Sequence, residues 1–105
     1  MKVYIAGPVT AITNYKETFF AAAEKLTKAG HAVMNPAVMP EAGFMHAEYM
    51  IVALAMQSIC DATILLPGWE QSCGAKIEKK TAEDNGQPIF YGIDDFLQKQ
   101  EVDDA

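Results

Sequence analysis

The sequence predicts one α/β domain over residues 1–105, built on a doubly wound parallel sheet of four to five strands. Short apolar runs, typical of buried strands, alternate with longer segments of helical periodicity. Gly and Pro residues separate most of these segments. Strands that alternate with helices are joined by right-handed crossovers, which place helices on both faces of a parallel sheet.

The first third of the chain predicts two strands with a helix between them. A β-rich run over 2–6 is broken by Gly7 and Pro8, and we expect it to form the central strand. A helix is expected over 15–29, because one face of it collects apolar residues at three- and four-residue spacing, namely Phe19, Ala22, Ala23 and Leu26. Gly30 is well placed to end that helix, and the second strand follows over 31–34.

The rest of the chain repeats the alternation after an irregular connection through residue 43. A helix is expected over 45–59, and its apolar residues occupy more than one face, so we expect it to be well buried. Asp61 opens a strand over 62–66. Ser72 suits the N-cap of a helix over 73–83, which Asn85 and Gly86 end. A fourth strand over 88–91 and a short helix over 93–100 complete the prediction.

Composition excludes several classes of function. The net charge of −6 disfavours binding to a nucleic-acid polymer, which requires a basic face. Cys60 and Cys73 have neither metal-ligand spacing nor a disulfide framework, and we expect both to be reduced. No signal peptide or membrane-spanning run is recognisable, so we expect a cytoplasmic protein without membrane contact.

Three strand-to-helix loops, over 7–14, 34–43 and 67–72, are the candidate ligand-binding segments, because ligands of such sheets bind at the carboxyl ends of the strands. Gly7 stands alone, without the glycine-rich fingerprint of a dinucleotide site. The loop also lacks the Lys-Ser or Lys-Thr of a phosphate-binding loop. We therefore expect no nicotinamide cofactor and no hydrolysis of a nucleoside triphosphate. From the spacing of the two cysteines we also expect no metal.

The segment from Asp61 to Glu83 carries the clearest candidate for chemistry. A strand, a Pro67-Gly68 break and a polar loop lead to Ser72 at the start of a helix. Glu78 lies about one and a half turns further on, where its carboxylate can point toward the N-terminus of the helix and into the crevice at the strand ends. The ordinary alternative is a solvated helical Glu beside Lys79 and Lys80.

Three motifs together resemble the nucleoside 2-deoxyribosyltransferase-like superfamily. They are YIAGP at 4–8, NP at 35–36 and CDATILLPGWEQSCGAKIE at 60–78. The match is best to a small, largely uncharacterised branch common in bacteria and phages, and it extends through Tyr91. The resemblance implies a flavodoxin- or Rossmann-like sheet. It also implies chemistry at the N-glycosidic bond of a nucleoside or nucleoside 5′-monophosphate, without a cofactor.

The same resemblance implies roles for individual residues. Glu78 matches the carboxylate that attacks the anomeric carbon, and Tyr4 matches a residue that positions it. Ser72 matches the residue at the 5′ end of the substrate, which is commonly Asp in nucleoside transferases and Ser in a related nucleotide hydrolase. The other candidate substrate-binding residues are Gly7, Pro8, Gly74 and Trp69. A Ser hydroxyl at a helix N-terminus suits a phosphate, and an indole can stack on a base or exclude water.

Alternatives remain for several of these residues. Tyr4 on a central strand is by default a core residue, and Trp69 suits a subunit interface as well as a pocket wall. Asn14 and Tyr15 either line the mouth of the site or cap the helix that begins there.

One position departs from the resembled family. Relatives carry an Asp eight residues before the residue that matches Asp61, where it handles the leaving base, and this chain has Ala53. His46, seven residues earlier on the same helix, can approach the pocket or remain at the surface. Two functions therefore stay open: an enzyme acting through Glu78, and a nucleotide-binding module without turnover.

The resemblance also implies assembly, because the relatives are dimers or larger. The helix expected over 45–59 has apolar residues in excess of what one core needs, Met50 and Met56 among them. We therefore expect a homodimer or a higher homo-oligomer.

Overall fold

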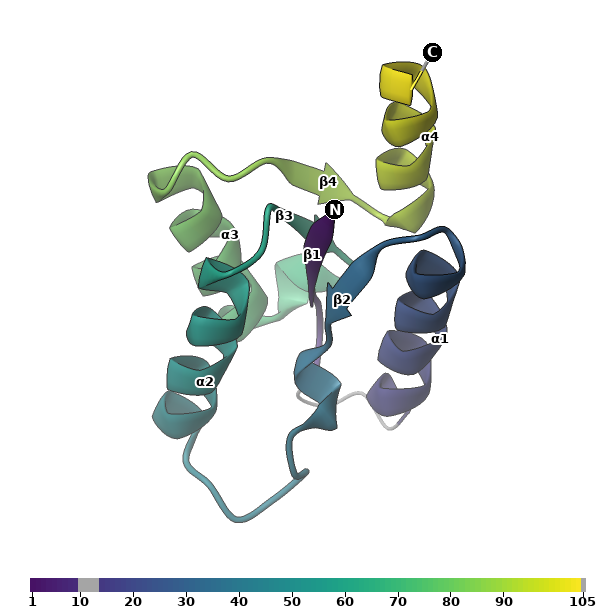
Figure 1. Ribbon diagram of the computed structural model, residues 1–105. Coiled ribbons are helices and arrows are strands. Elements are labelled where there is room, and N and C mark those ends of the chain that lie inside the picture. The colour runs from purple at the N-terminus through teal and green to yellow at the C-terminus, as the bar shows by residue number, and fades with distance from the viewer. Residues whose placement is uncertain (10–13, 105) are drawn as a thin grey trace.

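The structure of the protein, a computed structural model, describes residues 1–9 and 14–104, with side chains through residue 100. Four parallel strands form one sheet in the order β2-β1-β3-β4 (Figure 1). Their bounds are Lys2–Ala6 for β1, Ala32–Met34 for β2, Ala62–Leu65 for β3 and Ile89–Tyr91 for β4. The predicted doubly wound parallel sheet is thus confirmed, with the predicted central strand β1 between β2 and β3.

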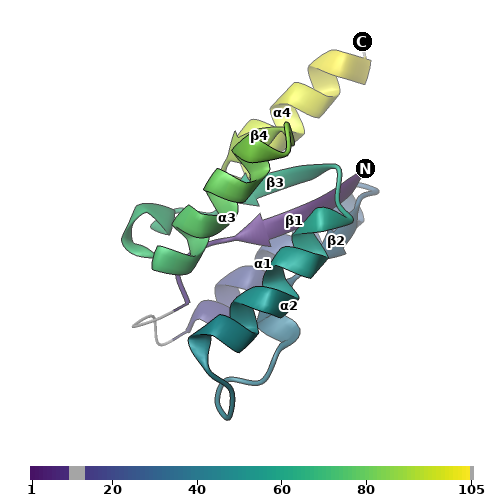
Figure 2. The ribbon, with the colours of Figure 1, turned by 90° about the vertical axis from the view of Figure 1, so that its left-hand side faces the viewer.

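Four α-helices cover the two faces of the sheet. Their bounds are Tyr15–Lys28 for α1, His46–Ser58 for α2, Cys73–Asp84 for α3 and Ile93–Asp104 for α4. The helices α1 and α4 lie on one face, while α2 and α3 lie on the other, which Figure 2 shows from the front. Two 3-10 turns, η1 over Pro36–Val38 and η2 over Trp69–Gln71, follow β2 and β3 in segments where the sequence predicts irregular connections.

Side-chain alternation along β1 divides the core into two parts. Val3 and Ile5 point toward α1 and α4 and belong to the larger cluster, which includes Phe19, Leu26 and Phe96. Tyr4 and Ala6 point to the other face, where a smaller cluster forms with Ala53 and Leu65. The period-2 geometry of a strand therefore delivers the Tyr4 side chain to the α2 and α3 side.

The expectation that the second long helix is well buried is wrong. Only Ala53 and Gln57 of α2 are buried, while Ile51 is 70% exposed and Val52 and Ile59 are also exposed. Ala53 and Gln57 are four residues apart and lie on one side of the helix, so α2 packs on the rest of the chain along a narrow stripe.

The predicted helix ends are mostly confirmed. Ser72 is the N-cap of α3, and its Oγ accepts from the Ala75 N–H at 3.1 Å. Gly30 and Gly86 have φ values of +94° and +69° just past α1 and α3, as glycines that end helices do. Asn14 precedes α1 without a side-chain capping bond, so the alternative in which its side chain caps this helix is wrong. Residues 10–13 of the predicted first loop lie outside the described residues.

No helix within 1–9 or 14–104 combines the length and apolar character needed to cross a bilayer.

Candidate active site

The strand order places a crevice above β1 and β3. From β1, the chain crosses over α1 to β2 on one side and later reaches β3 on the other. The loops that leave β1 and β3 therefore diverge to opposite faces of the sheet, and this is the point where ligands bind in open α/β sheets. Gly7 ends β1 and the 67–72 loop ends β3, so the predicted segments meet there.

A cavity of about 430 Å³ lies at this edge, which is the size of many small-molecule sites. Its lining comes from the loop after β1, from α1, from the segment after β2, and from α2 and α3. The lining residues are Gly7, Val9, Tyr15, Phe19, Pro36, Met39, Pro40, Glu41, His46, Tyr49, Met50, Ala53, Ser72, Gly74, Ala75 and Glu78. The cavity thus joins a mostly apolar wall to a few polar groups on α3.

Glu78 is the buried carboxyl group of this cavity. It lies in the middle of α3 on the side that faces the sheet, and it is only 6% exposed. The hydroxyl of Tyr4, which is fully buried on β1, donates a hydrogen bond to Oε2 of Glu78. The alternative of a solvated helical Glu is therefore excluded by the fold, and Tyr4 is both a core residue and the partner of this carboxyl.

Burial controls the protonation of this pair. Loss of hydration raises the pKa of Glu78 to about 7, although the Tyr4 hydrogen bond opposes the rise by favouring the charged form. Burial, together with the adjacent Glu78 carboxyl, raises the pKa of Tyr4 far above its usual value. Near neutral pH the site therefore holds a carboxyl group divided between its acid and carboxylate forms, beside a phenol that stays protonated.

The N-terminus of α3 forms the polar end of the cavity. Ser72 and Gly74 line it, about one and a half turns before Glu78 on the same helix. A Cβ atom at Gly74 would lie 3.2 Å from Sδ of Met50 and 3.8 Å from Cε1 of His46. Glycine therefore lets α2 approach the first turn of α3, where unpaired amides and the positive end of the helix dipole favour an anion.

Three further residues line the cavity, of which the sequence prediction named only Tyr15, and that one only as an alternative. Tyr15, Glu41 and Tyr49 all line it, and burial together with the Glu41 charge raises the pKa of Tyr15. The hydroxyl of Tyr49 donates to the Pro40 carbonyl at 2.8 Å and ties α2 to the preceding segment. The sequence offered no signal for Glu41, because the 39–45 segment has no periodicity that assigns a face. Tyr49 lies on the predicted 45–59 helix, whose apolar residues occupy more than one face and so did not show which side meets the cavity.

The structure brings together four of the seven predicted site residues as cavity lining and places a fifth beneath them. Gly7, Ser72, Gly74 and Glu78 line the cavity, and Tyr4 reaches it through its hydrogen bond to Glu78. Pro8 and Trp69 are not among the lining residues. The Trp69 ring instead lies 5.9 Å from the Tyr91 ring, with Nζ of Lys79 5.8 Å from its centroid. Contact of Pro8 or Trp69 with a substrate stays a prediction.

Ala53 and His46 occupy the α2 wall of the same cavity. Ala53 is buried there, so a neutral methyl group stands where the resembled family has a carboxyl. His46, at the first residue of α2, also lines the cavity, two turns from Ala53. Within 1–9 and 14–104, no three His, Cys, Asp or Glu side chains group closely enough to bind a metal ion.

A family model described as "Domain of unknown function (DUF4406)" matches residues 1–91. This range contains every lining residue of the cavity. No curated protein and no solved structure matches the chain significantly.

Proposed function

The chain belongs to the family described as Domain of unknown function (DUF4406), and we propose that it cleaves or transfers the N-glycosidic bond of a nucleoside 5′-monophosphate through Glu78. The resemblance to nucleoside 2-deoxyribosyltransferase-like proteins is part of the same proposal. One observation carries it: a buried carboxyl group, held by a buried phenol, faces a cavity of nucleotide size.

The two ends of the cavity suit the two ends of a nucleotide. The N-terminus of α3, with the Ser72 hydroxyl and Gly74, would take the 5′-phosphate. Helical side chains tilt toward the N-terminus of their helix, so the Glu78 carboxyl reaches back toward a sugar placed one turn from that phosphate. The apolar wall with Tyr15 and Tyr49 would hold the base.

The proposed reaction has two steps. The Glu78 carboxylate attacks C1′ of the sugar, and the bond from C1′ to the base nitrogen breaks. The base leaves with the bonding electron pair and takes up a proton from solvent. Water, or a second base in a transfer reaction, then attacks C1′ and gives up its proton, which releases the sugar and restores the carboxylate.

The alternative function is a nucleotide-binding module without turnover. Ala53 favours it, because a methyl group cannot donate a proton to the leaving base. His46 lines the cavity two turns away, and it is a candidate to supply that proton in place of solvent. The two functions differ in turnover and share the binding site.

Base release from a panel of ribo- and deoxyribonucleosides and their 5′-monophosphates, followed by chromatography, tests the proposal. We expect slow release of free base from at least one monophosphate, and loss of that release in Glu78→Gln, which keeps the size of the side chain. Ala53→Asp should raise the rate, since a general acid typically supplies about 10²–10⁴-fold.

The panel also separates the two functions. If wild type and Ala53→Asp bind a nucleotide but neither releases base, the enzyme hypothesis fails and the binding module stands. If Glu78→Gln retains full turnover, Glu78 is not the nucleophile.

A further inference from the structure

Behind Glu78, on the side away from the cavity, a buried amide network joins α2, β3 and the segment that enters β4. Its members are Gln57, the last buried residue of α2, Thr63 of β3, and Gln87 before β4. Gln57 is 2% exposed and Thr63 is fully buried. Buried polar side chains of this kind are stable only when they are hydrogen-bonded, so the network has a fixed geometry.

The two donors of the Gln57 amide are both used. Its Nε2 donates to the main-chain carbonyl of Glu78 at 2.8 Å and to Oγ1 of Thr63 at 2.9 Å. Among the described residues, its Oε1 has no hydrogen-bond partner. The bonds that the amide donates to Glu78 and Thr63 therefore set its orientation.

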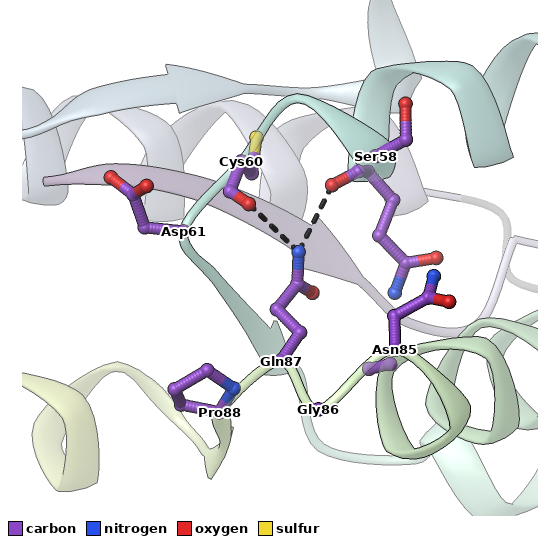
Figure 3. A pocket seen from close by; sticks show the side chains of 9 residues that line it. Ser58, Cys60, Asp61, Asn85, Gly86, Gln87 and Pro88 are labelled. Carbon is purple, nitrogen blue, oxygen red and sulfur yellow. Dashed lines mark hydrogen bonds between the residues drawn. The ribbon is translucent and has the colours of Figure 1, made fainter.

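Gln87 holds Gln57 in turn. Its Nε2 donates to the carbonyls of Gln57 at 3.1 Å and Cys60 at 2.9 Å (Figure 3). Its Oε1 accepts from the Thr63 hydroxyl. The three side chains thus close a ring of hydrogen bonds around the end of α2. Gln57 also lines a second cavity of about 300 Å³ near the amino ends of β3 and β4, which Figure 3 shows from close by.

We propose that Gln57 is a positioning residue for Glu78, an inference that rests on the proposed function of Glu78. The other buried residues of α3 are Ala75 and Ala82, whose small methyl groups resist sliding and rotation of the helix only weakly. The bond from Gln57 reaches the main chain of residue 78 itself. It holds this turn of α3 at the axial position and rotation at which the Glu78 carboxyl meets the Tyr4 hydroxyl.

Gln57→Met and Thr63→Val form the matched test. Methionine keeps the length of the side chain but gives no donor to the Glu78 carbonyl. Valine removes the Thr63 bonds but keeps the Gln57 donor that reaches the Glu78 carbonyl. A role in stability alone predicts similar behaviour of the two variants, whereas positioning predicts that only Gln57→Met affects Glu78.

Two readouts apply to both variants. The first is kcat and KM for the monophosphate that wild type cleaves. We expect Gln57→Met to lower kcat by about 10- to 100-fold with little change in KM, as a small misplacement of a reacting group does, and Thr63→Val to retain most of kcat.

The second readout, titration of the Glu78 carboxyl carbon by NMR, needs no turnover. In Gln57→Met we expect the pKa of Glu78 to fall toward its ordinary value, because desolvation is the larger of the two causes and better hydration of a displaced carboxyl outweighs the loss of its Tyr4 bond. An unchanged titration in Gln57→Met, or equal shifts in both variants, would overturn the positioning role. This readout stands even if no nucleotide is cleaved, so failure of the inference is distinguishable from failure of the proposed function.

Discussion

At the scale of single residues, Glu78 and Tyr4 form a pair whose protonation depends on burial. Glu78 is only 6% exposed, so its carboxyl has lost most of its hydration. This desolvation raises the pKa of Glu78 by more than the Tyr4 hydrogen bond lowers it. A nucleophile needs the carboxylate form, so the pKa of about 7 places the onset of the proposed activity near neutral pH.

The raised pKa of Glu78 predicts a pH-dependent stability. Between its ordinary pKa of 4.5 and about 7, the folded protein holds a proton that the unfolded chain has released. The contribution of Glu78 to the free energy of unfolding is therefore fully present below pH 4.5 and is lost as the pH rises through about 7. The loss is on the order of 3 kcal/mol. Urea unfolding as a function of pH should show this loss in wild type and not in Glu78→Gln.

Tyr4→Phe gives the matched control for that measurement. Removing the hydroxyl removes a bond that favours the charged carboxylate, so the loss of stability should move to higher pH. Parallel stability profiles for wild type and Glu78→Gln would contradict the burial argument.

At the scale of one element, α3 carries both polar functions of the site. Its N-cap, Ser72, accepts from the Ala75 N–H, and its middle presents Glu78 to the cavity. An N-cap side chain and a phosphate contact use the same hydroxyl differently: the oxygen accepts from the helix, while the hydrogen remains for a ligand oxygen.

Substitution of Ser72 predicts a reversal of ligand preference. Aspartate is a good N-cap, so Ser72→Asp should keep α3 intact, but its charge repels a 5′-phosphate. We expect wild type to bind a nucleoside 5′-monophosphate more tightly than the matching nucleoside, and Ser72→Asp to prefer the nucleoside. Calorimetric titration measures both affinities. Equal affinity of wild type for the two ligands would remove the phosphate role from Ser72.

At the scale of the whole molecule, the outer side of α2 is the surface that the fold leaves apolar. Ile51 is 70% exposed, Val52 and Ile59 are exposed beside it, and Glu48 is the only acidic or basic residue other than His46 along the helix. Exposed apolar faces of this kind commonly mark contacts between proteins.

We predict that this face of α2 mediates homo-oligomer formation. Light scattering at tens of micromolar should give a dimer or larger mass for wild type. Ile51→Glu should lower that mass, because it places a charge in the contact without disturbing the buried core. Phe20→Glu is the matched control, since Phe20 is 47% exposed on α1, across the sheet, and this variant should keep the wild-type mass. A monomeric wild type would contradict the prediction.

The sequence by itself determined the fold class, because strand and helix periods and their Gly and Pro boundaries are local signals. The first three strands and helices were predicted with ends within one or two residues of those observed, as with the expected 73–83 helix against Cys73–Asp84. The final helix was the exception, since it continues to Asp104 beyond the predicted 100. Ser72 as the N-cap was also predictable, because the cap lies three residues from the amide it binds.

Only the tertiary structure decided which of these residues meet. The period of a helix does not say which side packs inward, so α2 was expected to be buried although most of it is exposed. Periodicity also did not distinguish a solvated Glu78 from a buried one held by Tyr4, which lies 74 residues earlier. Gln57 gave no local signal, since its partners lie 6 and 21 residues away. Contacts between segments distant in the chain depend on strand order and on the helix faces that the sheet covers, and these are properties of the folded molecule.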